Sequence, residues 1–284
     1  MKYFIKRNLL IFFRDRGSVF FSLLGVLVII GLYILFLGDV MVNNIRDLPG
    51  ARFMMDSWIM AGLLAVTPIT TSLGALGNIL VDRKYGMYND FAASPLKRRT
   101  IVSGYLLSAF FISLILTLLT FVLGELYIVL YGGRLLPLEA ALKVLALVLF
   151  TTVSSSIMMF YLVTWFKSIN AFSAASTITG TLIGFLTGIY IPIGSLPGPI
   201  QTVIKLFPPS HAAVLLRSIM MEEAQSMVFA GAPAEALRAF RLELGVAFEV
   251  GGRILSPYIS LSYMACFMAL FFVLTLIRIN KKQV

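Results

Sequence analysis

The chain has 284 residues, of which 59% are hydrophobic and only 13% charged, with a mean hydropathy of +0.94. Soluble domains carry about 25% charged residues, so this composition excludes a soluble globular domain, a disordered chain and a nucleic-acid-binding protein. The net charge of +10 in so apolar a chain indicates membrane topology rather than a polyanionic partner.

The first predicted element is a short amphipathic helix over residues 1–16, in which Lys and Arg are interleaved with Phe, Leu and Ile. It is too short to cross a bilayer, so we expect an interfacial helix on the cytoplasmic leaflet. A basic lead-in to the first span is the alternative. No small-residue cleavage site follows the next apolar run, so we expect no cleaved signal peptide.

Six stretches without Asp, Glu, Lys or Arg predict six transmembrane helices, since about 20 residues cross the hydrocarbon core. They cover 18–38, 57–81, 100–124, 144–166, 168–204 and 254–277. The fifth is too long for one span and is broken by Pro192, Pro197 and Pro199, so its span is expected at about 170–191. The predicted fold is an all-α membrane protein with one transmembrane domain over residues 1–284.

Basic residues are distributed unequally between the two sides of such a bundle. The side with both termini carries 14 Lys and Arg residues against three acids, and the other side carries nine of each. The positive-inside rule therefore places both termini in the cytoplasm. We expect a multi-pass protein of the cell membrane, specifically the bacterial cytoplasmic membrane.

The cytoplasmic loop 82–99 between spans two and three predicts two short helices. Tyr85, Tyr88 and Phe91 follow helical spacing and form an aromatic face. A second helix would begin with Ser94 as its N-cap and Pro95 in its first turn. The aromatic face needs a surface to pack on, and composition leaves open whether that surface is a partner protein or the lipid headgroups.

The outer loop 192–256 is the longest. Its first part is too apolar for a free loop and too rich in proline to span, which favours a re-entrant hairpin. The hairpin residues singled out are Pro192, Leu196, Pro197, Pro208 and Pro209. Residues 220–250 are more polar, with Leu237, Phe240 and Leu244 at helical spacing, and predict a small external cap.

Catalytic motifs are weak. The chain has no phosphate-binding GxxxxGK[ST] loop, so any ATP would be bound by another subunit. An intramembrane serine protease built on Ser195 and His211 is disfavoured, because only a loop links the two. We expect no metal site and no cofactor in this chain, since His and carboxylates show no ligand spacing and Cys266 is the one cysteine.

Glu125 is the one acid inside a predicted span, and Lys143 is its expected partner. A proton-coupled transporter would use such a carboxylate. Because Glu125 lies near the outer interface, structural pairing is favoured over a proton relay.

Uncharged polar residues line two of the spans. Those expected on a substrate pathway are Thr67, Thr70, Thr71 and Asn78 in span two, with Ser173, Thr177 and Thr181 in span five. Gly180, Gly184 and Gly188 repeat at the spacing that lets helices pack closely. Ordinary packing inside one subunit is the alternative to a pathway or a dimer seam.

Two segments resemble the signatures of the type-2 permeases of ATP-binding-cassette exporters. At 86–104 the chain reads GMYNDFAASPLKRRTIVSG, and at 188–217 it reads GIYIPIGSLPGPIQTVIKLFPPSHAAVLLR. The number of spans, the amphipathic N-terminus and the long loop before the last span agree with this family. Met87 and Asn89 depart from its pattern, where Thr and Glu are usual.

The resemblance implies that two permease copies or paralogues pair and bind two cytoplasmic ATPase subunits, which hold ATP and Mg²⁺. The loop 82–99 would then be the coupling helix, and 192–217 the hairpin at the outer gate. The residues that the resemblance assigns to ATPase coupling are Asp82, Arg83, Tyr85, Gly86, Tyr88, Asp90, Phe91 and Pro95.

The sequence therefore predicts the membrane subunit of an ATP-driven exporter, not an enzyme by itself. Its uncharged pathway suits an amphipathic or lipophilic substrate, such as a drug, lipid, peptide or glycolipid. An ion-coupled secondary transporter and a non-transporting membrane sensor are the alternatives.

Overall fold

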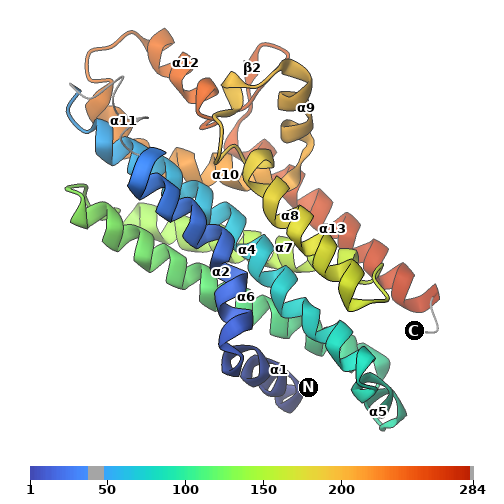
Figure 1. Ribbon diagram of the computed structural model, residues 1–284. Coiled ribbons are helices and arrows are strands. Elements are labelled where there is room, and N and C mark those ends of the chain that lie inside the picture. Colours follow the sequence, from blue (N-terminus) through green and yellow to red (C-terminus); the bar gives the residue numbers. More distant parts are fainter. Residues whose placement is uncertain (38–47, 282–284) are drawn as a thin grey trace.

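The computed structural model of the protein describes residues 1–37 and 48–281. Apart from one short β-hairpin, the described regular structure is helical (Figure 1). The hairpin pairs β1 (Glu249–Val250) with β2 (Arg253–Ile254) in antiparallel register, Glu249 opposite Ile254 and Val250 opposite Arg253. This confirms the predicted all-α class.

The helices follow one another along the chain with mostly short connections. They are α1 (Lys2–Arg14), α2 (Arg16–Leu32) with its π-helical extension η1 (Tyr33–Leu37), α4 (Ala51–Lys84), α5 (Met87–Ala93), α6 (Arg98–Leu130), α7 (Leu138–Val163), α8 (Ile169–Leu186), the 3₁₀ turn η2 (Ile193–Ser195), α9 (Gly198–Leu206), α10 (Pro208–Met220), α11 (Glu222–Val228), α12 (Ala234–Glu243) and α13 (Pro257–Lys281).

Six helices of the described chain are long and apolar enough to cross a membrane. They cover Arg16–Leu35, Ala51–Lys84, Arg99–Leu130, Leu138–Val163, Ile169–Leu186 and Pro257–Ile279. These correspond to the six predicted spans, and the fifth ends at Leu186, before the prolines, as expected. A helix satisfies its backbone hydrogen bonds internally, which is what the hydrocarbon core requires.

The central helix is α4, which is buried along almost its whole length and packs against α2, α6, α7, α8 and α10 (Figure 1). Its small and polar side chains are enclosed by the neighbouring helices rather than facing lipid, so α4 forms the core of the bundle. Hydroxyl pairs join it to its neighbours: Thr71 bonds Ser113 of α6 at 2.8 Å, and Ser72 bonds Ser156 of α7 at 2.9 Å. The Ser113 hydroxyl also donates to the carbonyl of Pro68, inside α4.

The N-terminal helix α1 is amphipathic and turns sharply into α2 at Asp15. The Asp15 carboxylate accepts hydrogen bonds from the Gly17 N–H and the Ser18 hydroxyl, and so caps α2. Phe4, Asn8 and Phe12, spaced four residues apart, form the buried face of α1. Its other faces are exposed, as an interfacial helix requires.

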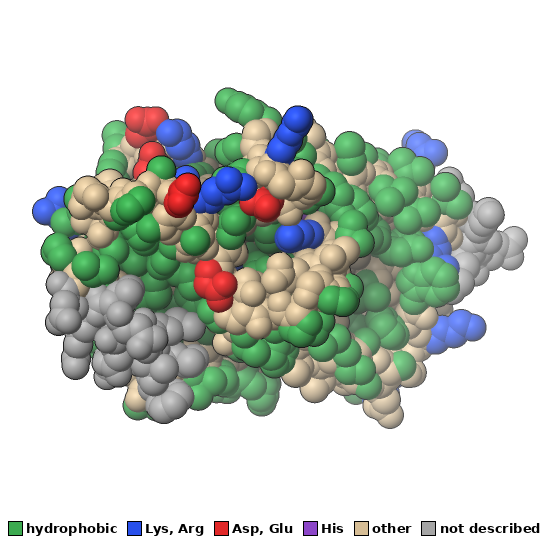
Figure 2. Space-filling view, turned by 90° about the horizontal axis from the view of Figure 1, so that it is seen from above, with side chains coloured by type: hydrophobic (Ala, Val, Ile, Leu, Met, Phe, Trp, Pro, Cys, Tyr) green, Lys and Arg blue, Asp and Glu red, His purple; other side chains and the backbone are tan. Residues whose placement is uncertain are grey.

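A helical hairpin and a small cap follow α8. Pro208 and Pro209 occupy the first turn of α10, where missing N–H groups cost nothing. The helix α10 is almost wholly buried against α4, α7 and α13, whereas α9 is largely exposed. Above them lie α11, α12 and the β-hairpin, and Figure 2 shows both signs of charge together on this cap. Arg238 pairs there with Glu249 at 2.7 Å.

The structure corrects two expectations. The predicted second helix beginning at Pro95 is wrong: residues 95–97 are irregular, α6 begins at Arg98, and the Ser94 hydroxyl bonds back to the Phe91 carbonyl, ending α5.

The predicted pairing of Glu125 with Lys143 is also wrong. Lys143 bonds Glu139 one turn earlier on α7 at 2.6 Å, and Glu125 accepts from the Leu136 N–H at 3.0 Å.

Candidate coupling site

A tight turn connects the short helix α5 to the end of α4. Gly86 adopts φ +79°, a left-handed conformation that favours glycine, and lets the chain reverse after α4. Tyr88 and Phe91 of α5 face the bundle and are half-buried, whereas Asn89 and Asp90 are exposed. The helix therefore has an apolar inner face and a polar outer face.

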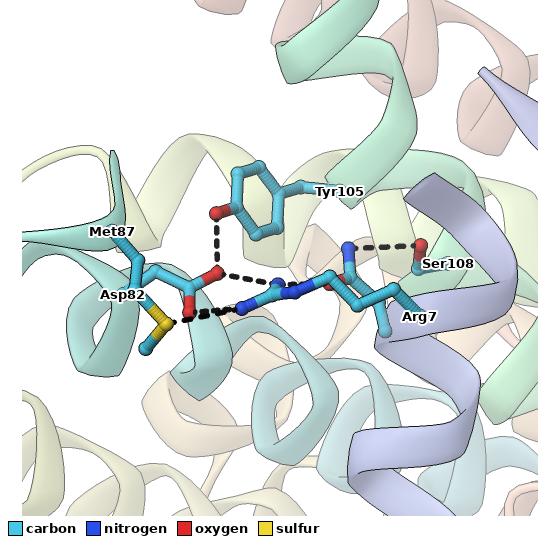
Figure 3. Close-up of polar contacts among 6 residues, drawn as sticks. Arg7, Asp82, Met87, Tyr105 and Ser108 are labelled. Carbon is cyan, nitrogen blue, oxygen red and sulfur yellow. Dashed lines mark hydrogen bonds and ion pairs between the residues drawn. The ribbon is translucent and has the colours of Figure 1, made fainter. Parts of the chain in front are cut away.

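Next to α5, an ion pair ties α1 to the end of α4 (Figure 3). The Arg7 guanidinium donates to both oxygens of Asp82, at 2.7 and 2.8 Å, and the Asp82 side chain is only 3% exposed. The Tyr105 hydroxyl of α6 donates to the same carboxylate at 2.6 Å. Bidentate, charge-assisted bonds of this kind are strong and fix orientation.

Aromatic contacts extend this cluster to α5. The Phe4 ring packs edge-on against both Phe91 and Tyr105, with centroid distances of 5.1 and 4.9 Å. The Arg7 guanidinium lies 5.0 Å from the Phe91 ring centroid, and donates to the Met87 sulfur at 3.5 Å. The three aromatic rings and the cation thus belong to one packed group, in which α5 contacts α1 directly.

The cluster joins α1 to three helices, α4, α5 and α6, that lie far from it in sequence. A further bond from Asn8 to the Ser108 hydroxyl, at 3.2 Å, adds a second link between α1 and α6 (Figure 3). The hydrogen bond to Asp82 raises the pKa of Arg7 above its ordinary value, so the guanidinium stays charged. A displacement of α5 would therefore be transmitted to α1, α4 and α6 together.

The predicted coupling residues differ in their surroundings. Asp82 lies inside the cluster, and Arg83 stacks on Tyr88 with 5.2 Å from the guanidinium carbon to the ring centroid. Tyr85 precedes α5 and is 68% exposed, and Pro95 is exposed after it. Of the expected set, Asp90 and Tyr85 are the side chains best placed to touch a partner. Arg7, Phe4 and Tyr105 were not foreseen, because no local pattern marks a contact between residues about 75–100 positions apart.

The predicted pathway residues of α4 differ in how deeply they are buried. Thr67 and Thr71 are fully buried, and each hydroxyl donates to the carbonyl one turn earlier, so they belong to packing inside the subunit. Thr70 and Asn78 are only half-buried. The predicted residues of α8, Ser173, Thr177 and Thr181, are all exposed.

The glycine repeat of α8 does not form one packing stripe. Gly184 is covered by the Tyr190 ring of its own chain, and Gly188 ends the helix with φ +67° against Ile193. Nothing in the described chain lies within 4 Å of the position a Cβ would take at Gly180. Only Gly180 therefore offers an open surface for another helix.

A family model for ABC-2 type transporters matches residues 1–221 of the chain, from α1 to the end of α10. The chain belongs to the ABC-2 type transporter family. The match covers the coupling cluster, the central helix and the hairpin in one alignment. No curated protein matches the sequence. The permease is therefore a multi-pass membrane protein of a transport family that is not catalytic by itself and that works with an ABC ATPase.

The permease also contains a buried arginine, Arg217, which is the last residue of the sequence segment 188–217. Arg217 of α10 is fully buried, and its guanidinium donates to the Gly188 carbonyl at 3.0 Å and lies 4.6 Å from the Trp58 ring centroid. Its other contact is the Gly245 carbonyl at 3.5 Å, and no carboxylate of the described chain pairs with it. Arg217 thus joins α4, α10, the end of α8 and the cap.

His211 and Ser195 do not form a catalytic pair in the permease. The ring nitrogens of His211 contact the Ser260 hydroxyl at 3.1 Å and the Lys205 carbonyl at 2.8 Å. Ser195 bonds instead to Glu243 of the cap. His211 therefore ties α10 to α13 and to α9, which is a structural role.

Proposed function

We propose that the permease is the membrane subunit of an exporter that moves an amphipathic or lipophilic substrate outward across the bacterial cytoplasmic membrane. Two copies, or one copy and a paralogue, would pair and bind two cytoplasmic ABC ATPases, which hold ATP and Mg²⁺. The substrate class comprises drugs, lipids, peptides and glycolipids. The observation that carries this proposal is the arrangement of α5, with its inner face fixed to three other helices and its polar face exposed.

Such an arrangement suits the transfer of mechanical work. A helix held only by its turn at Gly86 would yield when a partner pushed on it. Contacts of Phe91 with Phe4, and of Arg7 with Asp82, make α5 part of a rigid group, so a push moves α1, α4 and α6. Rigid-body motion of packed elements is the usual route to alternating access.

The exposed residues of α8 support the proposed nature of the pathway. Ser173, Thr177 and Thr181 are polar but uncharged, and their helix is the least buried of the six spans. Hydroxyl side chains on an exposed face gain contacts when a second copy covers them. A wall without charges accepts an amphipathic molecule more readily than an ion, because it offers no compensating charge.

The alternative of ion-coupled transport needs an acid that takes up protons within the bundle. Glu125 is buried and accepts one hydrogen bond, from Leu136, while its second oxygen has no partner in the described chain. Its position close to the outer end of α6 and the family assignment both favour the ATP-driven function.

The proposal is tested by charge reversal on the outer face of α5. The permease is coexpressed with the ABC ATPase encoded nearest to it, purified in mild detergent and reconstituted in liposomes. We expect the wild-type pair to copurify and hydrolyse ATP, and Asp90→Arg to reduce copurification and ATPase activity at least five-fold. The matched control is Glu235→Arg, a reversal at an exposed site on α12, which should change neither.

Two outcomes contradict the proposal. One is a permease that purifies without any nucleotide-binding partner yet transports in proteoliposomes when an ion gradient is imposed. The other is an equal loss of ATPase activity in the Asp90 and Glu235 variants. In the first case, Glu125→Gln would abolish transport, whereas the proposed exporter tolerates this change.

A further inference from the structure

A pocket opens at the end of the bundle that carries α5, beside the coupling cluster. It encloses about 550 Å³, including space open to solvent. Its walls come from the ends of α4, α7 and α13, the start of α6, and Tyr88 of α5. The lining residues are Ile79, Arg83, Tyr88, Val102, Tyr105, Phe160, Val163, Thr164, Arg278 and Ile279. Most of this surface is apolar.

Two arginines line this apolar surface, Arg83 from α4 and Arg278 from α13. The Arg83 guanidinium stacks on Tyr88, and the Arg278 guanidinium lies 3.5 Å from the Trp165 ring centroid. Arg278 also donates to the Thr164 carbonyl at 3.4 Å. The aromatic rings fix the planes of both guanidinium groups, so each retains N–H groups for a further acceptor.

Neither arginine is neutralised within the described chain. No carboxylate there lies within 4.0 Å of Arg83 or Arg278, and the nearby Asp82 is engaged by Arg7 and Tyr105. The Nε atoms of both arginines are buried and have no hydrogen-bond partner. Buried donors without acceptors are costly. The pocket therefore combines two positive charges, unused donors and an apolar floor.

We propose that this pocket binds one anionic phospholipid of the cytoplasmic leaflet, with its phosphate between Arg83 and Arg278 and an acyl chain along Ile79, Val102 and Phe160. Guanidinium groups match phosphate oxygens in bidentate geometry. Basic pockets between membrane helices on the cytoplasmic side recognise such headgroups, and anionic lipid is enriched there. The apolar floor explains why a lipid fits better than a soluble phosphate.

A lipid bound in this pocket would also affect α5 and therefore coupling. Tyr88, on whose ring the Arg83 guanidinium stacks, belongs to α5. Tyr105 lines the pocket and is also part of the coupling cluster. A lipid held against Tyr88 would brace α5 in addition to the contact between Phe91 and Phe4. The inference goes beyond the proposed exporter function and does not depend on it, because lipid binding requires neither substrate nor ATPase.

Native mass spectrometry of the delipidated full-length permease tests this site. The protein is titrated with phosphatidylglycerol, with phosphatidylcholine of the same acyl chains, and with glycerol 3-phosphate. We expect one phosphatidylglycerol to bind at least ten-fold more tightly than phosphatidylcholine, and glycerol 3-phosphate not to displace it at millimolar concentration. Equal binding of the two lipids to the wild-type protein would overturn the proposal, as would full displacement by glycerol 3-phosphate, which would indicate a soluble phosphate.

Paired substitutions locate the bound lipid. Arg83→Gln with Arg278→Gln should abolish the preference for phosphatidylglycerol. Lys97→Gln with Arg99→Gln removes the same charge from exposed positions near the start of α6 and should retain it. Equal loss in both double variants would mean attraction by net charge alone and refute a defined site. Circular dichroism without lipid tests whether each variant is folded. If a variant fails to fold, the comparison of phosphatidylglycerol with phosphatidylcholine on the wild-type protein still tests the proposal.

Discussion

At the scale of single residues, the ion pair between Arg7 and Asp82 dominates the coupling cluster. Asp82 lies in the last turn of α4, beside several basic residues, so its neighbours in sequence suggest several partners. In the structure the partner is Arg7 of α1, and the Tyr105 hydroxyl of α6 donates to the same carboxylate. The carboxylate loses its water and retains three hydrogen bonds in exchange.

Substitution of Arg7 tests this role. Arg7→Gln leaves the Asp82 charge buried without its cation, so we expect the permease to be destabilised by about 3 kcal/mol. Thermal unfolding of the detergent-solubilised protein measures the change. Arg14→Gln, at an exposed position of the same helix, should cost less than about 0.5 kcal/mol. The double variant Arg7→Met, Asp82→Leu should recover part of the loss; if it is as unstable as Arg7→Gln, the unpaired charge is not the cause.

At the scale of elements, α10 is a buried helix outside the six spans, held by polar contacts at fixed points. Its His211 accepts from the Ser260 hydroxyl and donates to the Lys205 carbonyl, which uses the neutral imidazole fully. Burial lowers the pKa of His211 below its usual value. A second proton would leave a charged donor facing the Ser260 oxygen in an apolar setting.

The hairpin should therefore lose stability in acid. The unfolded chain takes up a proton at its ordinary pKa of about 6.5, while the folded chain does so only at lower pH. Stability is complete above pH 6.5 and falls as the pH drops below it. We expect the melting temperature to decrease between pH 7.5 and 5.5, and His211→Gln to flatten this dependence. His211 is the only histidine, so an unchanged slope in the variant would exclude this explanation.

At the scale of the whole molecule, the six spans are buried to very different degrees. The central helix α4 is almost wholly enclosed, whereas α8 exposes Ser173, Thr177 and Thr181 together with Gly180. Lipid tails gain nothing from hydroxyl groups, so an exposed polar face on a membrane helix favours contact with protein or substrate. A second permease copy would provide that contact.

Cysteine cross-linking tests the expected dimer. In a Cys266→Ser background, single cysteines replace Ser173, Thr177 or Thr181, and mild oxidation in native membranes is followed by gel electrophoresis. We expect at least one position to give a covalent dimer in more than half of the protein, since a disulfide forms only when Cα atoms lie within about 7 Å. Leu149→Cys, on an exposed apolar face of α7, serves as the control. Monomer at all three positions, or equal dimer at position 149, would argue against an α8 seam.

The sequence by itself determined the class of the protein and the number and approximate place of its spans. Hydrocarbon requires continuous apolar helices, so the fifth span is expected to end before Pro192 and Pro197, and Lys205 lies beyond it. The motif at 86–104 likewise located α5. These features depend on residues close together in the chain, which is why local pattern reveals them.

Only the tertiary structure decided which polar groups meet. Thr67 and Thr71 follow the same pattern as Thr70, yet they are buried inside the subunit because α6 covers that face of α4. Lys143 pairs with Glu139, one helical turn away, because both side chains are exposed on α7 while Glu125 is buried. Burial and pairing depend on which helix covers which face, and packing over the whole bundle sets that choice.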